Sequence, residues 1–190
     1  MAELLGGFAG VVRARALKKL EPQIALAALL TFIVICATWI DAWKSLQAVT
    51  LDFEGLWAPI LVATFYYLAA ATAFPRETEG FDALGSYFVQ RKKFIVGMLL
   101  LAEFVEMYTF RSVLIKAYWH YPAVFWLWLA PYNLAIKSSF VALFLVRSRR
   151  WNIILLTALV LLFILPYWEN GAIERAIIRH YDYGPSSHQA

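Results

Sequence analysis

Two glutamates lie in the middle of a strongly apolar stretch, LLLAEFVEMYTF, which covers residues 99–110. Glu103 and Glu106 are three residues apart, so a helix places both on the same side. A charge at the centre of a bilayer costs on the order of 2.5 to 3.5 kcal/mol unless it is paired or hydrated. Acids in such a position either belong to a proton or ion pathway or form a polar link between helices.

Counting residues from the nearest basic segments gives Glu103 a partner. Glu103 is the tenth residue from Phe94, and Lys137 precedes Arg147 by ten residues. At roughly 1.5 Å per residue, both side chains lie about 15 Å from the same end of two antiparallel helices. The sequence therefore predicts an ion pair between Glu103 and Lys137.

The same count of residues gives the second acid an uncharged polar neighbour. Glu106 and Asn133 each lie one turn further from the basic ends, so we expect Glu106 near Asn133, with Tyr132 or Tyr108 beside it. Pro131 removes one backbone hydrogen bond close to these residues and can free a carbonyl there. Two readings stay open: a titratable relay, or a static link in which Glu106 is protonated and hydrogen bonded.

The composition identifies the solvent of this chain. It has 190 residues, of which 62% are hydrophobic and 16% charged. Soluble domains average about 45 to 50% apolar and about 25% charged residues, so the bilayer is the expected environment. The single cysteine, Cys36, excludes a disulfide framework or a cysteine-rich metal site within one chain. The net charge of +4 comes from basic clusters beside apolar segments, a pattern typical of membrane surfaces and not of nucleic-acid binding.

A membrane-spanning helix needs roughly 20 mostly apolar residues. The sequence predicts an all-α integral membrane protein, a bundle of about five transmembrane helices in a single domain over residues 23–168. The five predicted spans are residues 24–43, 56–74, 94–113, 123–146 and 151–168. The first apolar region is longer than the core of a signal peptide, so we expect a retained anchor.

The basic residues alternate between the two sides of the predicted bundle. Eleven of the 17 Lys and Arg residues fall on one side: Arg13, Arg15, Lys18 and Lys19; Arg76, Arg91, Lys92 and Lys93; Arg147, Arg149 and Arg150. The positive-inside rule then puts the N-terminus in the cytoplasm and the C-terminus outside. Trp residues agree with this orientation, because Trp39, Trp43, Trp57, Trp119 and Trp168 all fall near the predicted outer boundary.

Three segments flank or connect the spans. Residues 1–22 are basic, and residues 3–20 have the periodicity of an amphipathic helix on the anionic inner leaflet; the alternative is a basic leader that only fixes the topology. Phe81, Leu84, Tyr87 and Phe88 predict a short amphipathic helix leading into the third span. Residues 169–190 predict a short periplasmic interfacial helix and a tail.

The loop FPRETEGFDALGSYFVQRKKF, residues 74–94, carries a resemblance. Its order of Phe-Pro, acids, Asp-Ala-Leu, Tyr-Phe and Arg-Lys-Lys-Phe resembles a pattern in small uncharacterised bacterial inner-membrane proteins. The resemblance implies a multi-pass protein of the bacterial inner (cytoplasmic) membrane. It implies no activity.

Sequence motifs of common catalytic sites are missing from the chain. We find no phosphate-binding or dinucleotide-binding glycine loop, no HExxH pair and no GxSxG elbow, so we expect no enzyme, cofactor or metal site. The expected function is a non-catalytic accessory or scaffold subunit of a larger membrane assembly, bound to other membrane subunits or to a second copy. The alternative is a proton- or cation-linked transporter or channel using Glu103, Glu106 and Lys137; the third class is a lipid-acting membrane enzyme.

Overall fold

A computed structural model of the chain describes residues 6, 21–46, 53–73, 84–117, 121–169 and 171–182. Within these ranges the chain is almost entirely helical and has no strand. The elements are α2 (Pro22–Leu46), α3 (Phe53–Ala73), α4 (Leu84–Ala117), α5 (Pro122–Val124), the π-helix η5 (Phe125–Leu129), α6 (Ala130–Leu145), α7 (Arg149–Glu169), α8 (Ala172–Ile177) and the π-helix η6 (Ile178–Asp182).

Four of the described helical segments are long and apolar enough to cross a membrane. They are Pro22–Trp43, Leu56–Ala73, Pro122–Leu145 and Arg149–Trp168, which match four of the predicted spans to within about two residues. The prediction of an all-helical, multi-pass membrane protein is confirmed. The predicted amphipathic helix over residues 3–20 falls outside the described residues, apart from Gly6.

The third predicted span lies within α4, a single helix of 34 residues. The short amphipathic helix expected before this span is not a separate element, because α4 runs without a break from Leu84 into the apolar segment. Phe88 is buried there, and the Tyr87 hydroxyl donates a hydrogen bond to the Thr72 carbonyl at 3.0 Å. This hydrogen bond connects the start of α4 to the end of α3.

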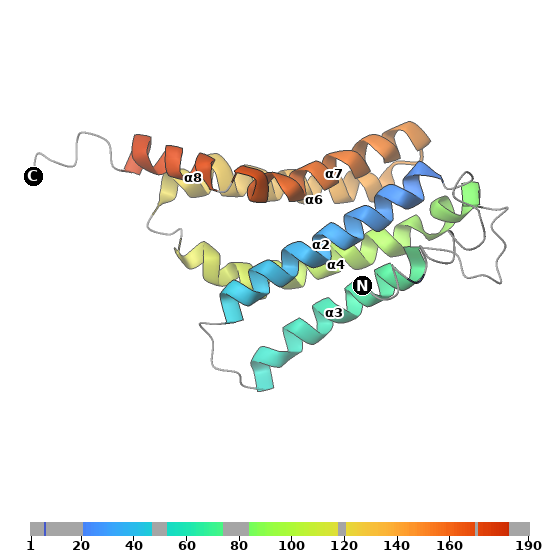
Figure 1. Cartoon of the computed structure of the whole chain (residues 1–190), viewed down its shortest axis with the longest axis horizontal. Coiled ribbons are helices and arrows are strands. Elements are labelled where there is room, and N and C mark those ends of the chain that lie inside the picture. Colours follow the sequence, from blue (N-terminus) through green and yellow to red (C-terminus); the bar gives the residue numbers. More distant parts are fainter. Residues whose placement is uncertain are drawn as a thin grey trace, which may run out of the picture.

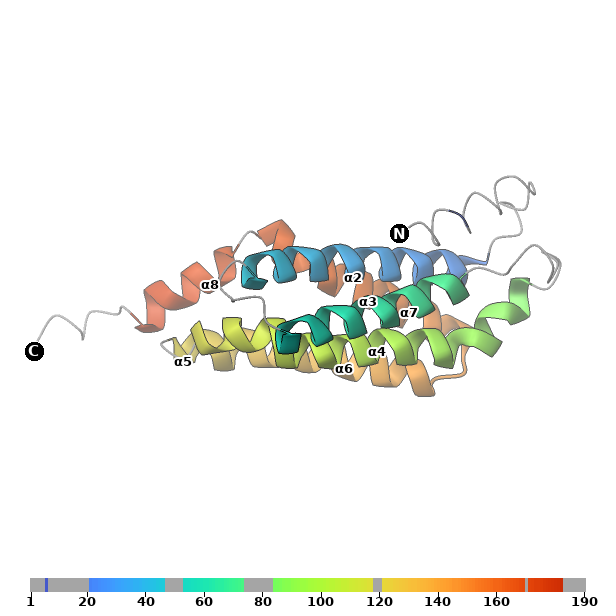
Figure 2. The same cartoon turned by 90° about the horizontal axis from the view of Figure 1, so that it is seen from below.

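The helices form an elongated bundle in which α2 and α4 are central (Figures 1 and 2). Helix α2 packs against α3, α4 and α7, and α4 packs against α2, α3 and α6. Helices α6 and α7 pack together on one side, and α3 lies on the opposite side of α2 and α4 (Figure 1). The α2 and α4 helices run in the same direction (Figure 1).

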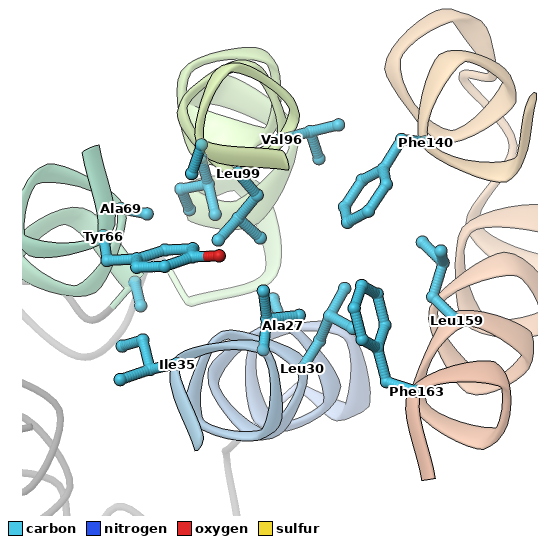
Figure 3. Packing of buried hydrophobic residues seen from close by; sticks show 14 of the residues in the cluster. Ala27, Leu30, Ile35, Tyr66, Ala69, Val96, Leu99, Phe140, Leu159 and Phe163 are labelled. Carbon is cyan, nitrogen blue, oxygen red and sulfur yellow. The ribbon is translucent and has the colours of Figure 1, made fainter. Parts of the chain in front are cut away.

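Aliphatic, aromatic and small side chains fill the core between these helices (Figure 3). Phe140 of α6 and Phe163 of α7 are buried and meet edge to face, with ring centroids 6.3 Å apart. Buried alanines such as Ala27 and Ala69 let neighbouring backbones approach closely, as is usual where lipid tails supply no hydrophobic drive for helix association.

The sequence predicts a broken backbone hydrogen bond at Pro131, and the structure has a widened helical turn directly before this residue. Residues 125–129 form a π-helix, and the Ala130 N–H donates to the Phe125 carbonyl five residues earlier. Proline has no N–H, and its ring clashes with the carbonyl four residues before it, so a wider turn accommodates Pro131. Trp126 on this turn is exposed, while Trp128 stacks on Tyr132.

The C-terminal helix predicted after the last span is present as α8 and η6. Gly171 separates it from α7 with a φ of 71°, a left-handed conformation that favours glycine. Trp39, Trp43, Trp57 and Trp168, predicted at the outer boundary, all have exposed side chains, and Trp119 lies outside the described residues.

Candidate functional site

Glu106 lies at the meeting point of three helices. Its side chain is fully buried on α4, and its Oε2 atom accepts hydrogen bonds from Thr38 Oγ1 of α2 at 2.8 Å and from the Tyr66 hydroxyl of α3 at 3.2 Å. The Thr38 and Tyr66 hydroxyl oxygens are themselves 2.6 Å apart. We call Glu106, Thr38 and Tyr66 the Glu106 triad.

Helical periodicity directs the triad residues inward. Thr38 follows the buried Thr31 by seven residues, two turns along the inner face of α2. On α3, Tyr66 shares its inward side with the buried Val62 and Ala69. Figure 3 shows the Tyr66 hydroxyl pointing from α3 into the space between α2 and α4.

The three oxygen contacts of the triad require three hydrogens. Each lies within hydrogen-bonding distance, and the Thr38 and Tyr66 hydroxyls supply one hydrogen each. With an ionised Glu106, two hydrogens serve three contacts. All three contacts can be ordinary two-centre hydrogen bonds when the Glu106 carboxyl group supplies the third hydrogen. The carboxyl group then donates to one hydroxyl and accepts from the other, and the two hydroxyls share the third bond.

Glu103 and Lys137 lie on helices that pack together, as the sequence predicted. Glu103 is fully buried on α4, one turn before Glu106. Lys137 is half-buried on α6, and its Nζ donates a long hydrogen bond of 3.4 Å to Asn133 Oδ1 on the same helix. Asn133 in turn donates from Nδ2 to the Leu129 carbonyl at 2.8 Å. The ion pair between Glu103 and Lys137 stays a prediction.

The hydrogen-bond partners of Glu106 are ones that the sequence reasoning missed. Thr38 and Tyr66 donate to Glu106, whereas the sequence predicts Asn133 near it, with Tyr132 or Tyr108; the proximity of Glu106 and Asn133 stays a prediction. The Tyr132 hydroxyl donates to a backbone carbonyl of α7, and Tyr108 is largely exposed. The prediction from residue counts considered only the two spans joined by one short outer loop, so it did not include the parallel helix α2.

A signal for the missed partner was present in the sequence. Gln23 of α2 and Lys92 of α4 lie near the starts of the apolar parts of two parallel helices. Thr38 follows Gln23 by 15 residues, and Glu106 follows Lys92 by 14, so both side chains lie about 21 to 23 Å further along. Comparing parallel spans in this way places Thr38 level with Glu106.

The buried polar side chains of the described residues follow the same two helices. Gln23, Thr31 and Thr38 are spaced by eight and seven residues on α2, and Lys92, Glu103 and Glu106 by eleven and three on α4; Asn152 of α7 completes the set. These spacings are close to whole numbers of turns, so each helix presents its polar residues on one inner face.

One group of these residues closes the end of the bundle that the positive-inside rule places in the cytoplasm. Lys92 is buried, and its Nζ donates to the Val146 carbonyl and to Asn152 Oδ1, the latter at 3.2 Å. Burial, with a smaller contribution from the charge of Lys93, lowers the pKa of Lys92. Lys92 therefore joins α4 to the link between α6 and α7.

The start of α2 is attached to the same link. Gln23 Nε2 donates to the Arg149 carbonyl at 3.1 Å, and Arg149 Nη2 forms an ion pair of 2.8 Å with Glu21. Because Lys92 and Gln23 both bind the segment between α6 and α7, four helices meet at this end.

On α4, an apolar layer separates this end from the two buried acids. Ile95, Val96 and Leu99 of α4 are buried between Lys92 and Glu103. Toward the other end, the half-buried Asp41 and Thr109 follow Thr38 and Glu106 by three residues each. Polar groups thus continue from the triad toward the predicted outer side. Toward the predicted cytoplasmic side, α4 contributes Glu103 and then the apolar layer, and α2 contributes the buried Thr31.

Within the described ranges, no group of three His, Cys, Asp or Glu side chains could hold a metal ion. Comparison with known proteins found no matching family model, no similar curated protein and no similar solved structure. The resemblance in residues 74–94 stays a prediction, and the functional proposals rest on the site.

Proposed function

We propose that this protein is a proton-linked membrane transporter in which Glu106 is the proton-binding residue. The supporting observation is the Glu106 triad: three oxygen contacts in a fully buried position, with hydroxyl groups that supply only two of the three hydrogens. A proton on Glu106 completes the triad and removes a charge that the membrane interior strongly disfavours.

Loss of that proton changes the packing of three helices. An ionised Glu106 leaves two hydrogens for three contacts, so the Thr38 and Tyr66 hydroxyls cannot both donate to Glu106 and still share a hydrogen bond. The protonated and ionised states therefore favour different arrangements of α2, α3 and α4. A ligand that favours one arrangement can then be coupled to proton binding.

The proposal includes α4 as the fifth membrane span. At roughly 1.5 Å per residue, its 34 residues extend about 50 Å, more than the hydrocarbon thickness of about 30 Å. Its two central acids are buried against neighbouring helices and do not face lipid. We place the chain in a bacterial inner membrane with the N-terminus cytoplasmic and the C-terminus periplasmic, which the basic residues support.

With this orientation, Glu106 exchanges its proton with the periplasmic side. Asp41 and Thr109 extend the polar surroundings of the triad in that direction, whereas Ile95, Val96 and Leu99 cover the cytoplasmic direction. Transport then requires a second arrangement in which the apolar layer opens.

Proton flux into liposomes tests the proposal. The wild-type protein should acidify the lumen under an imposed gradient, and Glu106→Gln should abolish the flux while the helix content is retained. Glutamine is the informative replacement because its neutral amide both donates and accepts, so it can complete the triad without exchanging a proton. Glu174→Gln, outside the spans, is the matched control and should transport normally. A wild-type protein that moves no protons contradicts the proposal.

An accessory or scaffold subunit is the second candidate. The observation in its favour is the row of exposed apolar side chains along the predicted lipid-facing side of α6, including Leu134, Val141 and Leu145, which another membrane subunit can cover. Stoichiometric copurification of a membrane partner, together with an absence of flux, would support it. A solitary, monodisperse particle that transports protons would contradict it.

A further inference from the structure

Exposed basic side chains from two distant parts of the sequence meet at the predicted cytoplasmic end of the bundle. They are Arg91 and Lys93 of α4 and Arg147, Arg149 and Arg150 at the link between α6 and α7. We call these five residues the basic patch. All five side chains are exposed at the surface of the bundle.

Contacts of the neighbouring residues hold the two parts of the patch together. Lys92 donates to the Val146 carbonyl and to Asn152, which fixes residues 91–93 of α4 beside the link. Lys93 Nζ lies 5.8 Å from the centre of the Phe144 ring. The basic patch is therefore a product of the fold, because 54 residues of chain separate Lys92 from Val146.

The local electrostatics favour an anion at this position. Arg149 and Arg150 occupy the first turn of α7, which contains no acidic residue. The first turn of a helix favours negative charge and disfavours cations. Within the patch, Arg149 forms an ion pair with Glu21, but the local charge stays strongly positive.

Apolar groups beside the patch identify the class of anion. Phe94 and Trp151 follow the basic residues directly and have exposed side chains. Exposed aromatic residues next to exposed basic residues are typical of the boundary between lipid headgroups and acyl chains. A phospholipid can bind both the basic patch and the aromatic side chains, because its phosphate contacts the basic groups and its acyl chains cover the aromatic rings.

We propose that the basic patch binds the phosphate headgroup of an anionic phospholipid from the inner leaflet, with the acyl chains along Phe94 and Trp151. This binding goes beyond the proposed transport function. By bridging α4 and the link between α6 and α7, the lipid stabilises the closed cytoplasmic end of the bundle.

Lipid retention on the purified full-length chain tests this inference. Native mass spectrometry should show bound phosphatidylglycerol on the wild-type protein and much less on the triple variant Lys93→Gln, Arg147→Gln, Arg150→Gln. At about fivefold per basic residue near an anionic surface, retention should fall on the order of a hundredfold for three. Phosphatidylcholine should not replace phosphatidylglycerol.

A control variant at the other end of the bundle tests for nonspecific attraction. The variant Arg175→Gln, Arg179→Gln removes exposed basic residues at the opposite end of the bundle and should retain phosphatidylglycerol as the wild type does. Equal retention in the triple variant and this control overturns the inference. The thermal unfolding temperature gives a second test. If inorganic phosphate raises it as much as phosphatidylglycerol does, the inference is overturned, because the site then recognises free phosphate. If the triple variant does not fold, Arg147→Gln alone should still lower retention about fivefold.

Discussion

Removing the two hydroxyls of the Glu106 triad one at a time and together measures whether they share a hydrogen bond. Each hydroxyl takes part in two of the three contacts, so Thr38→Val or Tyr66→Phe leaves one contact and the double variant leaves none. At about 0.6 kcal/mol for an average hydrogen bond between membrane helices, each single variant should lower the free energy of unfolding by about 1.2 kcal/mol. The double variant should lower it by about 1.8 kcal/mol.

The difference between these values is the signature of the triad. The sum of the single effects counts the Thr38 to Tyr66 contact twice, so it should exceed the double effect by about 0.6 kcal/mol. The assay is reversible unfolding by a denaturing detergent in mixed micelles, followed by circular dichroism. Tyr67→Phe, the exposed neighbour on α3, is the control and should change stability by less than about 0.5 kcal/mol. Strict additivity of Thr38→Val and Tyr66→Phe would refute a shared hydrogen bond.

Two further predictions concern α4. Lys92→Met should lower the free energy of unfolding by about 1 to 3 kcal/mol, because it leaves the half-buried Val146 carbonyl and the buried Asn152 Oδ1 without their donor. The exposed Lys93→Met should cost less than about 0.5 kcal/mol, and equal losses in the same unfolding assay would contradict the role of Lys92. Gly97→Ala should stabilise the protein by about 0.5 to 1 kcal/mol, because alanine favours the helix more than glycine does. The added Cβ would lie 3.9 Å from the Phe144 ring, which is an ordinary van der Waals contact. A lower thermal unfolding temperature would show that α4 cannot accept the methyl group.

The membrane class of this protein could be read from its sequence. Spans 24–43, 56–74, 123–146 and 151–168 were found with small errors at their ends, because each is a continuous apolar run of a length set by the bilayer. The same local information predicted the C-terminal helix and a backbone disturbance at Pro131. The two buried acids of α4 were also identified from sequence, since a charge within an apolar run stands out.

The surroundings of the acids depended on which helices pack together. Sequence spacing placed Glu103 and Glu106 on one side of α4, but it did not reveal that this side meets α2 and α3. Thr38 and Tyr66 were missed because neither residue is charged, and a threonine or tyrosine in an apolar span is unremarkable without its neighbours. The buried role of Lys92 was missed for the opposite reason, because it stands in a basic run that predicts an exposed surface.

Hydropathy and charge are properties of successive residues, so the sequence determined the helical, multi-pass architecture and the positions of the acids along α4. The hydrogen-bond partners of Glu106 lie 68 and 40 residues away in the chain, and only the packing of α2 and α3 against α4 brings them together. Tertiary structure decided the arrangement of the triad because a hydrogen bond acts over about 3 Å, a distance that sequence separation does not constrain.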